Sequence, residues 1–291
     1  MIIEKAQELG LCFGVKRALK MLEGATSKHR EIETLGPIAH NQQLVERLIK
    51  IGIKPVNSLS QVQGEVLAVT THGTNPEVLS EAKARHIHII DTTCPLVRKT
   101  QNTAKELAQA GFSVIIFGEA EHSEVKALLG WAKDKGTAVL DVKQLDRLGR
   151  KPYRLGVISQ TTQLQPALMG FVGQLVATFG SKAREIRIIN TLCGIAQKRQ
   201  ESAVSLAKRS EIMIVVGGYN SANTNRLTEA CSHIVETHLV ERADEVNHIW
   251  FAGKQRIGIT AGASTPDETI EEVITKLRSF DTDAVIASEV I

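Results

Sequence analysis

The sequence predicts an α/β protein with three similar lobes, each built on a small, mostly parallel sheet, around a central cleft. Short, apolar, β-branched runs alternate with helical patterns along the chain, which is typical of strands covered by helices on both faces. One short segment also occurs three times, beginning at Cys12, Cys94 and Cys193. The copies lie roughly 100 residues apart, about the length of a small domain. The expected lobes are residues 1–94, 95–192 and 193–291, with the N-terminal strand packing in the third.

The repeated segment has the same order of residue types in each copy. A cysteine is followed three positions later by a small apolar residue (Val15, Val97 or Ala196), and a basic pair comes just after it. A strand-like or turn-like stretch precedes each copy, and a helical pattern follows. Because a helix N-terminus favours the thiolate form of a neighbouring cysteine, we expect each lobe to offer one thiolate to a shared centre. For any single cysteine, inert packing is the alternative, and the repetition of the context argues against it.

Composition excludes several classes of protein. The 291 residues are 43% hydrophobic and 23% charged, which is ordinary for a globular chain with a core. Aromatic residues make up 4% and the formal net charge is +3, so no nucleic-acid-binding surface is expected. No segment approaches the length of a membrane span, so no membrane partner is expected. The mildly basic balance suits an anionic small substrate or an acidic partner protein.

The four cysteines do not resemble a disulfide framework. The first residues carry charge at once and lack an apolar stretch, so no signal peptide is evident. We therefore expect a cytoplasmic protein with reduced thiols. Cys231 lacks the repeated context and is expected to be a small buried hydrophobe.

Strand and helix signals follow one another in the first lobe. Short strands are expected at 33–37, 66–70 and 87–90, the first of them running into a turn. Helices are expected after Cys12, from 39–41 to near Gly52, and after Asn75, which we expect to be the N-cap with Pro76 at the first helical position.

The same alternation continues in the second and third lobes. Strands are expected at 114–118, 138–140, 155–159, 212–217 and 257–260, with a short one at 284–286. Helices are expected from Pro95 to a stop signal at Gly111, after the 122–124 segment and after Cys193. A capping box at Thr265–Glu268 is expected to start the last helix.

Polar side chains gather where these strands end. They are His40, His72, His122, Glu124, Thr161, Ser221, Asn223 and Ser264. Ligands of α/β sheets bind at the carboxyl ends of the strands. If the lobes face one axis, these side chains and the three cysteines line one cleft.

Three cysteine thiolates from three lobes suit zinc or an iron–sulfur cluster. Zinc sites usually draw two ligands from a close pair such as C-x-x-C, and this sequence has none. A cluster can be held from three directions, and three cysteines leave one iron without a protein thiolate. Such an open position is what a catalytic metal keeps for its substrate.

The other strand-end side chains suggest an anion and a proton donor. His40, His72 and His122 can be cationic near a phosphate, and Ser221, Asn223 and Ser264 precede or begin helices, where anions bind. A carboxyl in a dry cleft has a raised pKa, so Glu124 can deliver a proton. Helix capping and dipole matching are the alternatives for these residues.

These residues and their neighbours resemble the LytB/IspH family of 4-hydroxy-3-methylbut-2-enyl diphosphate reductases. The resemblance runs in order over nearly the whole chain. It rests on the segments beginning at Gly10, Ala39, Thr71, Asp91, His122, Gln160, Asn190, Asn220 and Thr260. It implies a trefoil of three α/β lobes around one cubane [4Fe-4S] cluster. The family performs a two-electron reductive dehydroxylation that gives isopentenyl and dimethylallyl diphosphates, the last step of the non-mevalonate isoprenoid pathway.

The resemblance also implies roles for particular residues. Cys12, Cys94 and Cys193 resemble the cluster ligands, with one iron left open. Those resembling the diphosphate-binding residues are His40, His72, His122, Ser221, Ala222, Asn223 and Ser264. Thr161 resembles the residue near the substrate hydroxyl, and Glu124 resembles its proton source. The sequence itself does not show the electron donor, and the mildly basic charge balance makes an acidic ferredoxin or flavodoxin the expected kind.

Three positions depart from the family pattern. Ala222 stands where many members have a second serine of the diphosphate loop, so one hydroxyl contact is missing. Gln197 stands where a threonine is common, and Ser123 where a proline is frequent. Ala222 and Gln197 make a related cluster enzyme with another substrate one alternative. The other is a non-redox protein that binds phosphorylated metabolites, in which the cysteines bind zinc or merely pack.

Overall fold

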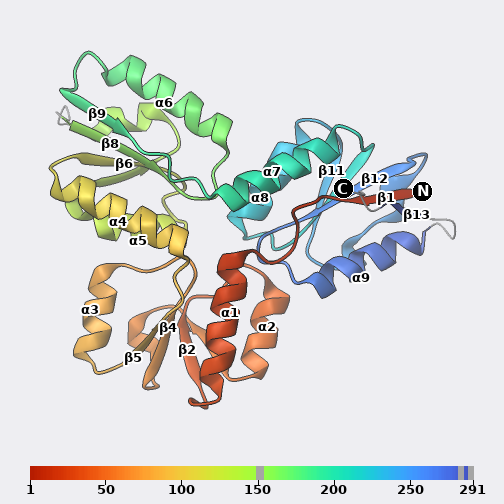
Figure 1. Ribbon diagram of the computed structural model, residues 1–291, viewed down its shortest axis with the longest axis horizontal. Coiled ribbons are helices and arrows are strands. Elements are labelled where there is room, and N and C mark those ends of the chain that lie inside the picture. The colour runs from red at the N-terminus through yellow and green to blue at the C-terminus, as the bar shows by residue number, and fades with distance from the viewer. Residues whose placement is uncertain (149–153, 281–284, 288–291) are drawn as a thin grey trace. The chain divides into compact units, whose positions relative to one another are not determined.

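The computed structural model describes residues 1–148, 154–280 and 285–287 (Figure 1). The chain forms two compact units. The first unit consists of Met1–Lys16, Ala39–Lys50 and Gly194–Ile291, and the second unit of Arg17–Ile38 and Ile51–Cys193. The lobe boundaries expected from the sequence, after residues 94 and 192, stay a prediction.

Helices and strands alternate in the described residues, as the apolar patterns predict. The α-helices are α1 (Phe13–Thr26), α2 (Gln42–Lys50), α3 (Pro76–Ala84), α4 (Pro95–Gln109), α5 (Ser123–Ala132), α6 (Gln165–Phe179), α7 (Gly194–Ala207), α8 (Ala222–Ser232) and α9 (Asp267–Arg278). The strands are β1 (Ile2–Lys5), β2 (Ile32–Leu35), β3 (Ile53–Val56), β4 (Val66–Val69), β5 (His88–Asp91), β6 (Ser113–Phe117), β7 (Gly136–Val139), β8 (Arg154–Ser159), β9 (Glu185–Ile188), β10 (Ile212–Val216), β11 (Thr237–Val240), β12 (Arg256–Ala261) and β13 (Val285–Ala287).

The described strands form three sheets whose first four strands are arranged in the same way, and one sheet has a fifth strand. These orders are β3-β2-β4-β5, β7-β6-β8-β9 and β11-β10-β12-β1-β13. All their strand pairs are parallel. The fourth strand of each order is the one that runs toward a repeated cysteine: β5 toward Cys94, β9 toward Cys193 and β1 toward Cys12. The predicted α/β class with small parallel sheets is confirmed.

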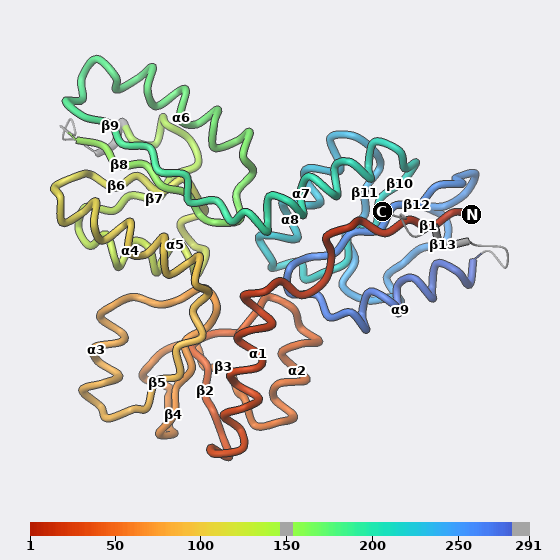
Figure 2. Tube along the Cα trace, in the orientation of Figure 1, coloured from red at the N-terminus to blue at the C-terminus, as the bar shows by residue number. Residues whose placement is uncertain are grey.

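The chain's first strand belongs to the sheet of the first unit. β1 lies between β12 and β13, and Figure 2 shows it in red beside the blue C-terminal strands. Residue 284, where the sequence predicts the last strand to begin, lies outside the described residues.

In the first unit, alternate residues of the central strand β10 face opposite layers of helices. Ile212, Ile214 and Val216 join a buried cluster with side chains of α9. Met213 and Val215 join a second cluster with side chains of α7 and α8. Since successive side chains of a strand point to opposite faces, the unbroken apolar run of β10 is the signature of a sheet covered on both sides.

The second unit repeats this arrangement around β6. Val114 and Ile116 are buried with side chains of α4 and α5, whereas Ile115 and Phe117 are buried with side chains of α6. The central strands β10 and β6 therefore each have buried side chains packed against helices on both faces.

One local expectation is wrong. The Thr265 side chain does not cap α9, because its hydroxyl donates to the carbonyl oxygen of Val216 at 3.0 Å and Pro266 occupies the N-cap. The Thr265 hydroxyl therefore binds the end of the buried strand β10 and not the first turn of α9. By contrast, Asn75 caps α3 as predicted, with its side chain accepting from the Glu77 N–H at 2.9 Å.

The longest α-helices of the described residues have 15 residues, and none of these helices is long and apolar enough to cross a bilayer.

We expect Ile214→Ala to lower the free energy of unfolding by about 2–5 kcal/mol, because it removes a fully buried side chain from the central strand β10. Chemical denaturation monitored by circular dichroism measures this difference. The matched control is Ile249→Ala, at a side chain that is 65% exposed, and its effect should stay within about 0.5 kcal/mol. Equal losses in the two variants would contradict the assigned core.

Candidate active site

Each repeated cysteine lies directly before a helix, as the sequence predicts. Cys12 precedes α1, Cys94 is the N-cap of α4 and Cys193 precedes α7. All three are partly exposed. Because these side chains are partly exposed, their sulfurs can reach a ligand.

The backbone of each cysteine is bound to the end of the adjacent strand in its sheet. The N–H of Cys12 donates to Ala263 O at 2.9 Å, that of Cys94 to Thr71 O at 3.0 Å and that of Cys193 to Thr161 O at 2.8 Å. The acceptors follow β12, β4 and β8, which are the third strands of the three sheet orders. The three cysteines thus occupy topologically equivalent positions.

Cys231 differs from these three residues. Its side chain is fully buried in the cluster beneath α7 and α8, and burial raises the pKa of its thiol to about 12. It is an inert packing residue, as its sequence context indicates.

Two arginines of the basic pairs after the cysteines have a structural role that was not expected from the sequence: they bind strand ends. Arg199 is 2% exposed and donates to the carbonyl oxygen of Ala261 at 2.9 Å. Arg98 donates to the carboxylate of Asp91 and to the hydroxyl of Thr93, which lie on the strand end before Cys94. These arginines hold the strand ends next to the cysteines, whereas Lys99 and Lys198 are exposed.

In the first unit, the start of α8 and the loop after β12 bring buried polar side chains to the strand ends. Ser221 is the N-cap of α8, and its hydroxyl accepts from the Thr224 N–H at 3.4 Å. Asn223 and Ser264 are each 6% exposed. Among the described residues, neither amide atom of Asn223 nor the hydroxyl of Ser264 has a hydrogen-bond partner. Buried polar atoms without partners are unfavourable, so these side chains are suited to receive a polar ligand.

Two glycines let these loops approach closely. A Cβ on Gly218 would lie 2.2 Å from the carbonyl oxygen of His40, and one on Gly262 would lie 2.2 Å from the hydroxyl of Thr224. His40 therefore belongs with Gly218 and α8 in the first unit. Burial lowers the pKa of its imidazole, so the ring favours its neutral form until an anion is beside it.

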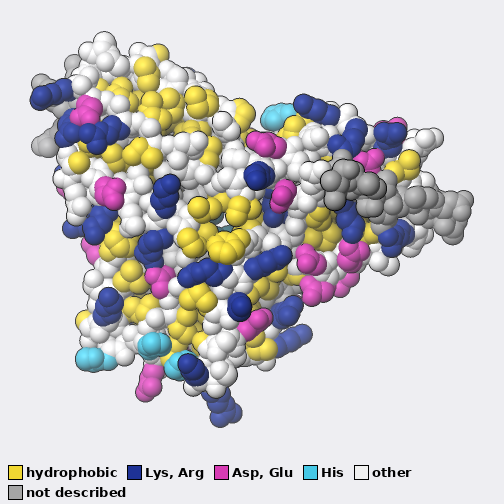
Figure 3. Space-filling model, viewed as in Figure 1, with side chains coloured by type: hydrophobic (Ala, Val, Ile, Leu, Met, Phe, Trp, Pro, Cys, Tyr) yellow, Lys and Arg dark blue, Asp and Glu magenta, His cyan; other side chains and the backbone are white. Residues whose placement is uncertain are grey.

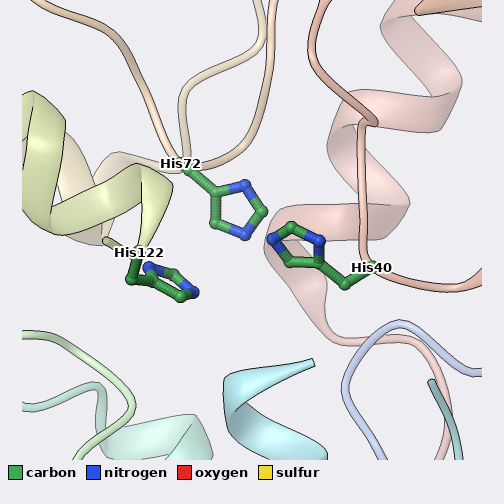
Figure 4. A group of neighbouring side chains, drawn as sticks. All are labelled: His40, His72 and His122. Atoms are coloured by element: carbon green, nitrogen blue, oxygen red, sulfur yellow. The ribbon is translucent and has the colours of Figure 1, made fainter. Parts of the chain in front are cut away.

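In the second unit, His72 and His122 come together. Their ring centroids are 5.4 Å apart in an edge-on arrangement, and Figure 4 shows His122 at the start of α5. Nδ1 of His122 accepts from the Glu124 N–H at 3.2 Å and so caps α5. Since Nδ1 is an acceptor, the ring proton of neutral His122 is on Nε2, where it can be donated to a ligand.

Glu124 and Thr161, which the sequence singles out separately, are in direct contact in the second unit. One carboxyl oxygen of Glu124 accepts from the Thr161 N–H at 2.7 Å, and the other is 2.8 Å from the Thr161 hydroxyl. Glu124 is 2% exposed. Burial raises its pKa to about 7 against the opposing effect of these two hydrogen bonds. The carboxyl can therefore hold or release a proton at neutral pH.

One face of the molecule carries charged side chains of both signs (Figure 3). Figure 3 shows basic and acidic side chains interspersed on the face that it presents. A nucleic-acid-binding surface would instead gather basic side chains of one sign.

The fold and these side chains define a class: an α/β enzyme with cysteines, buried polar side chains and a protonatable carboxyl at the ends of its parallel strands. The chain belongs to the LytB protein family, whose model matches residues 3–278.

Named relatives agree with this assignment. The chain is 43% identical over 277 residues to the 4-hydroxy-3-methylbut-2-enyl diphosphate reductase of Dehalococcoides mccartyi, covering 95% of this chain and 98% of the relative. It is 40% identical over 282 residues to the enzyme of the same name from Geobacter metallireducens, covering 97% and 98%.

Two solved structures are also similar. A structure of (E)-4-hydroxy-3-methyl-but-2-enyl diphosphate reductase, described as the terminal enzyme of the non-mevalonate pathway, has a TM-score of 0.69 and 34% identity and covers 96% of this chain and 99% of its own. The Plasmodium falciparum reductase structure has a TM-score of 0.90 at 24% identity, covers 100% and 92%, and bears on the fold alone.

As the pH rises from 5 to 8, we expect the free energy of unfolding of the Glu124→Gln variant to increase relative to that of the unsubstituted chain. A carboxyl whose pKa is raised to about 7 binds more protons in the folded chain than in the unfolded one. The free energy of unfolding of the unsubstituted chain therefore falls as the pH rises through that range. The gain should be on the order of 2–3 kcal/mol between the two ends. Thermal unfolding at several pH values measures it.

Glu121→Gln is the control, because Glu121 lies on the same loop and is fully exposed. A difference between Glu124→Gln and the unsubstituted chain that does not change with pH would show that Glu124 is ionised normally.

Proposed function

We propose that the chain catalyses the two-electron reductive dehydroxylation of (E)-4-hydroxy-3-methylbut-2-enyl diphosphate to isopentenyl and dimethylallyl diphosphate, the last step of the non-mevalonate isoprenoid pathway. Membership of the LytB family, together with reductase relatives at 43% and 40% identity over nearly the whole chain, carries this proposal. The reaction consumes two electrons and two protons and releases the hydroxyl group as water.

The proposed cofactor is one [4Fe-4S] cluster with Cys12, Cys94 and Cys193 as its protein ligands. The donor set fits this group, because these three cysteines are partly exposed and topologically equivalent while Cys231 is buried. When bound, such a cluster supplies the electrons and an open iron for the substrate hydroxyl. The backbone hydrogen bonds of the cysteines hold the ligand positions before the cofactor binds.

The proposed diphosphate-binding residues are His40, His72, His122, Ser221, Ala222, Asn223 and Ser264. Support comes from the polar atoms of Asn223 and Ser264, which are buried and have no hydrogen-bond partner within the described part of the chain. A diphosphate accepts hydrogen bonds from the amide, the hydroxyl and the rings, and its charge favours protonated imidazoles. Ala222 is the first residue of α8 and can contribute only its backbone N–H. N–H groups in the first turn of a helix have no partner within the helix and can bind an anion.

The proposed proton donor is Glu124, acting with Thr161. In its neutral form the carboxyl carries the proton that the allyl carbon or the leaving hydroxyl needs, and burial keeps that form populated near pH 7. The Thr161 hydroxyl lies 2.8 Å from the carboxyl, so it can bridge Glu124 and the substrate hydroxyl through hydrogen bonds.

The proposed partner is a small acidic electron carrier such as a ferredoxin or flavodoxin, and the proposed location is the cytoplasm, where thiols stay reduced. The exposed lysines Lys16, Lys99 and Lys198, one after each repeated cysteine, support an acidic carrier.

The test of the function is turnover of the hydroxymethylbutenyl diphosphate by anaerobically reconstituted protein with a low-potential donor. We expect Glu124→Gln to keep the cofactor and to lower kcat by about 100-fold or more, because the general acid is removed. We also expect kcat of the unsubstituted enzyme to fall as the pH rises above about 7, since Glu124 then loses its proton. Near-normal rates in Glu124→Gln would remove it from the acid role. An intact cluster without turnover would favour a related enzyme with another substrate.

The ligand set is tested by iron and sulfide analysis of anaerobically reconstituted variants. We expect Cys94→Ala to lose the cluster, because one of three protein ligands is absent, and Cys231→Ala to keep the full content, because its thiol is buried away from the strand ends. Zinc in stoichiometric amount without iron would contradict the proposal and favour a non-redox protein.

A further inference from the structure

A pocket in the second unit is lined by none of the proposed active-site residues. Its volume is about 380 Å³, within the usual range for small-molecule sites. The start of α3, the last turn of α4 and the end of α5 form it, together with the short 3-10 helix Lys133–Lys135. The side chains that matter here are those of Pro76, Lys105, Trp131, Lys133, Asp134 and Lys135.

The charge of this pocket is strongly positive. Lys105, Lys133 and Lys135 line it, and Asp134 is the only acidic residue among its lining residues. Two of the ammonium groups are held in place: Nζ of Lys135 donates to the carbonyl oxygen of Ala108 at 2.9 Å, and Nζ of Lys105 lies 5.8 Å from the centre of the Trp131 ring. Three lysines against one carboxylate suit a ligand with at least two negative charges.

The pocket also has a fixed aromatic wall. The indole N–H of Trp131 donates to the carbonyl oxygen of Thr74 at 3.0 Å, which locks the orientation of the ring. Trp131 and Pro76 are both half-buried, so they offer a preformed apolar surface beside the lysines. Such a surface binds a flat or apolar group at little entropic cost.

Lys133 is held in an unfavourable backbone conformation. Its φ is 54° and its ψ is −142°, and His86 is the only other non-glycine residue of the described chain with a positive φ. Glycine would occupy this position without strain. Strained residues are typical of ligand-binding positions, where the side chain is needed despite its cost in stability.

We propose that this pocket binds a small molecule in which a diphosphate or triphosphate is attached to an apolar or aromatic group. The lysines bind the phosphates, and Trp131 and Pro76 bind the attached group. Two kinds of metabolite share this chemistry, nucleotides and prenyl diphosphates. The site is separate from the proposed active site, so failure of one proposal leaves the other standing.

The chain offers a specific reporter for the test, because it has only two tryptophans. Trp250→Phe leaves Trp131 as the only tryptophan, and Trp250 itself belongs to the first unit, where it stacks on His238. Reconstituted Trp250→Phe protein is titrated anaerobically with ADP, with dimethylallyl diphosphate and with inorganic pyrophosphate, while Trp131 emission is recorded. We expect a saturable change with ADP or with dimethylallyl diphosphate. Because dimethylallyl diphosphate is also a product of the proposed reaction, only a change that the pocket variants weaken reports on this pocket and identifies the source. Pyrophosphate should bind at least tenfold more weakly, because it cannot contact the ring.

Variants in the Trp250→Phe background test which residues bind. We expect Lys105→Gln and Lys133→Gly each to weaken the binding about tenfold, because each removes one charge-assisted contact to phosphate. Lys83→Gln is the matched control, since Lys83 is an exposed lysine of α3 outside the pocket, and its affinity should be unchanged. Lys133→Gly should also raise the Tm by about 2 °C, because it relieves the positive φ, which separates lost binding from lost folding.

Three results would overturn the proposal. The first is the absence of a saturable Trp131 signal with both organic diphosphates. The second is affinity for pyrophosphate equal to that for the organic ligands, which would remove the ring from recognition. The third is unchanged affinity in both Lys105→Gln and Lys133→Gly, which would place the ligand elsewhere.

Discussion

One backbone hydrogen bond, made three times, sets the position of every repeated cysteine. In each sheet order, the segment after the fourth strand donates a cysteine N–H to a carbonyl oxygen just beyond the third strand, at Ala263, Thr71 and Thr161. The bond joins each cysteine to a loop that also carries a polar side chain of the candidate site: Ser264, His72 or Thr161. Because the sheets are covered by helices on both faces, these bonds rest on rigid strands, and a site built on rigid strands keeps its geometry without a ligand.

Polar side chains of the candidate site are buried at positions where they weaken the fold. The buried carboxyl of Glu124 accepts hydrogen bonds from the N–H and the hydroxyl of Thr161, and burial of its charge nevertheless raises its pKa to about 7. Asn223 and Ser264 keep polar atoms buried and without partners among the described residues. Clusters of fully buried aliphatic side chains on both faces of β10 and β6 supply the stability that tolerates them. The positive φ of Lys133, at the proposed second pocket of the second unit, is another unfavourable feature that this stability tolerates.

Much of the architecture could be predicted because its signals are local. The unbroken apolar runs of β6 and β10, the Asn75-Pro76 helix start and the cysteines before α1, α4 and α7 are all as predicted. The helix α6 was not predicted, because it is apolar on nearly every side and has a weak period. The capping role of Thr265 was predicted wrongly, since the carbonyl oxygen of Val216 lies near its hydroxyl only in the folded chain.

The sequence alone determined the family, the repeated cysteine segments and the residue types at the strand ends, since these depend on order and spacing along the chain. Tertiary structure decided which of those residues meet. Glu124 and Thr161 are 37 positions apart, and only the parallel pairing of β6 with β8 brings their side chains together. The burial of Glu124 that raises its pKa, the buried bond of Arg199 and the inertness of Cys231 likewise arise from distant segments. Desolvation is a property of everything packed around a group, and no local pattern of residues encodes it.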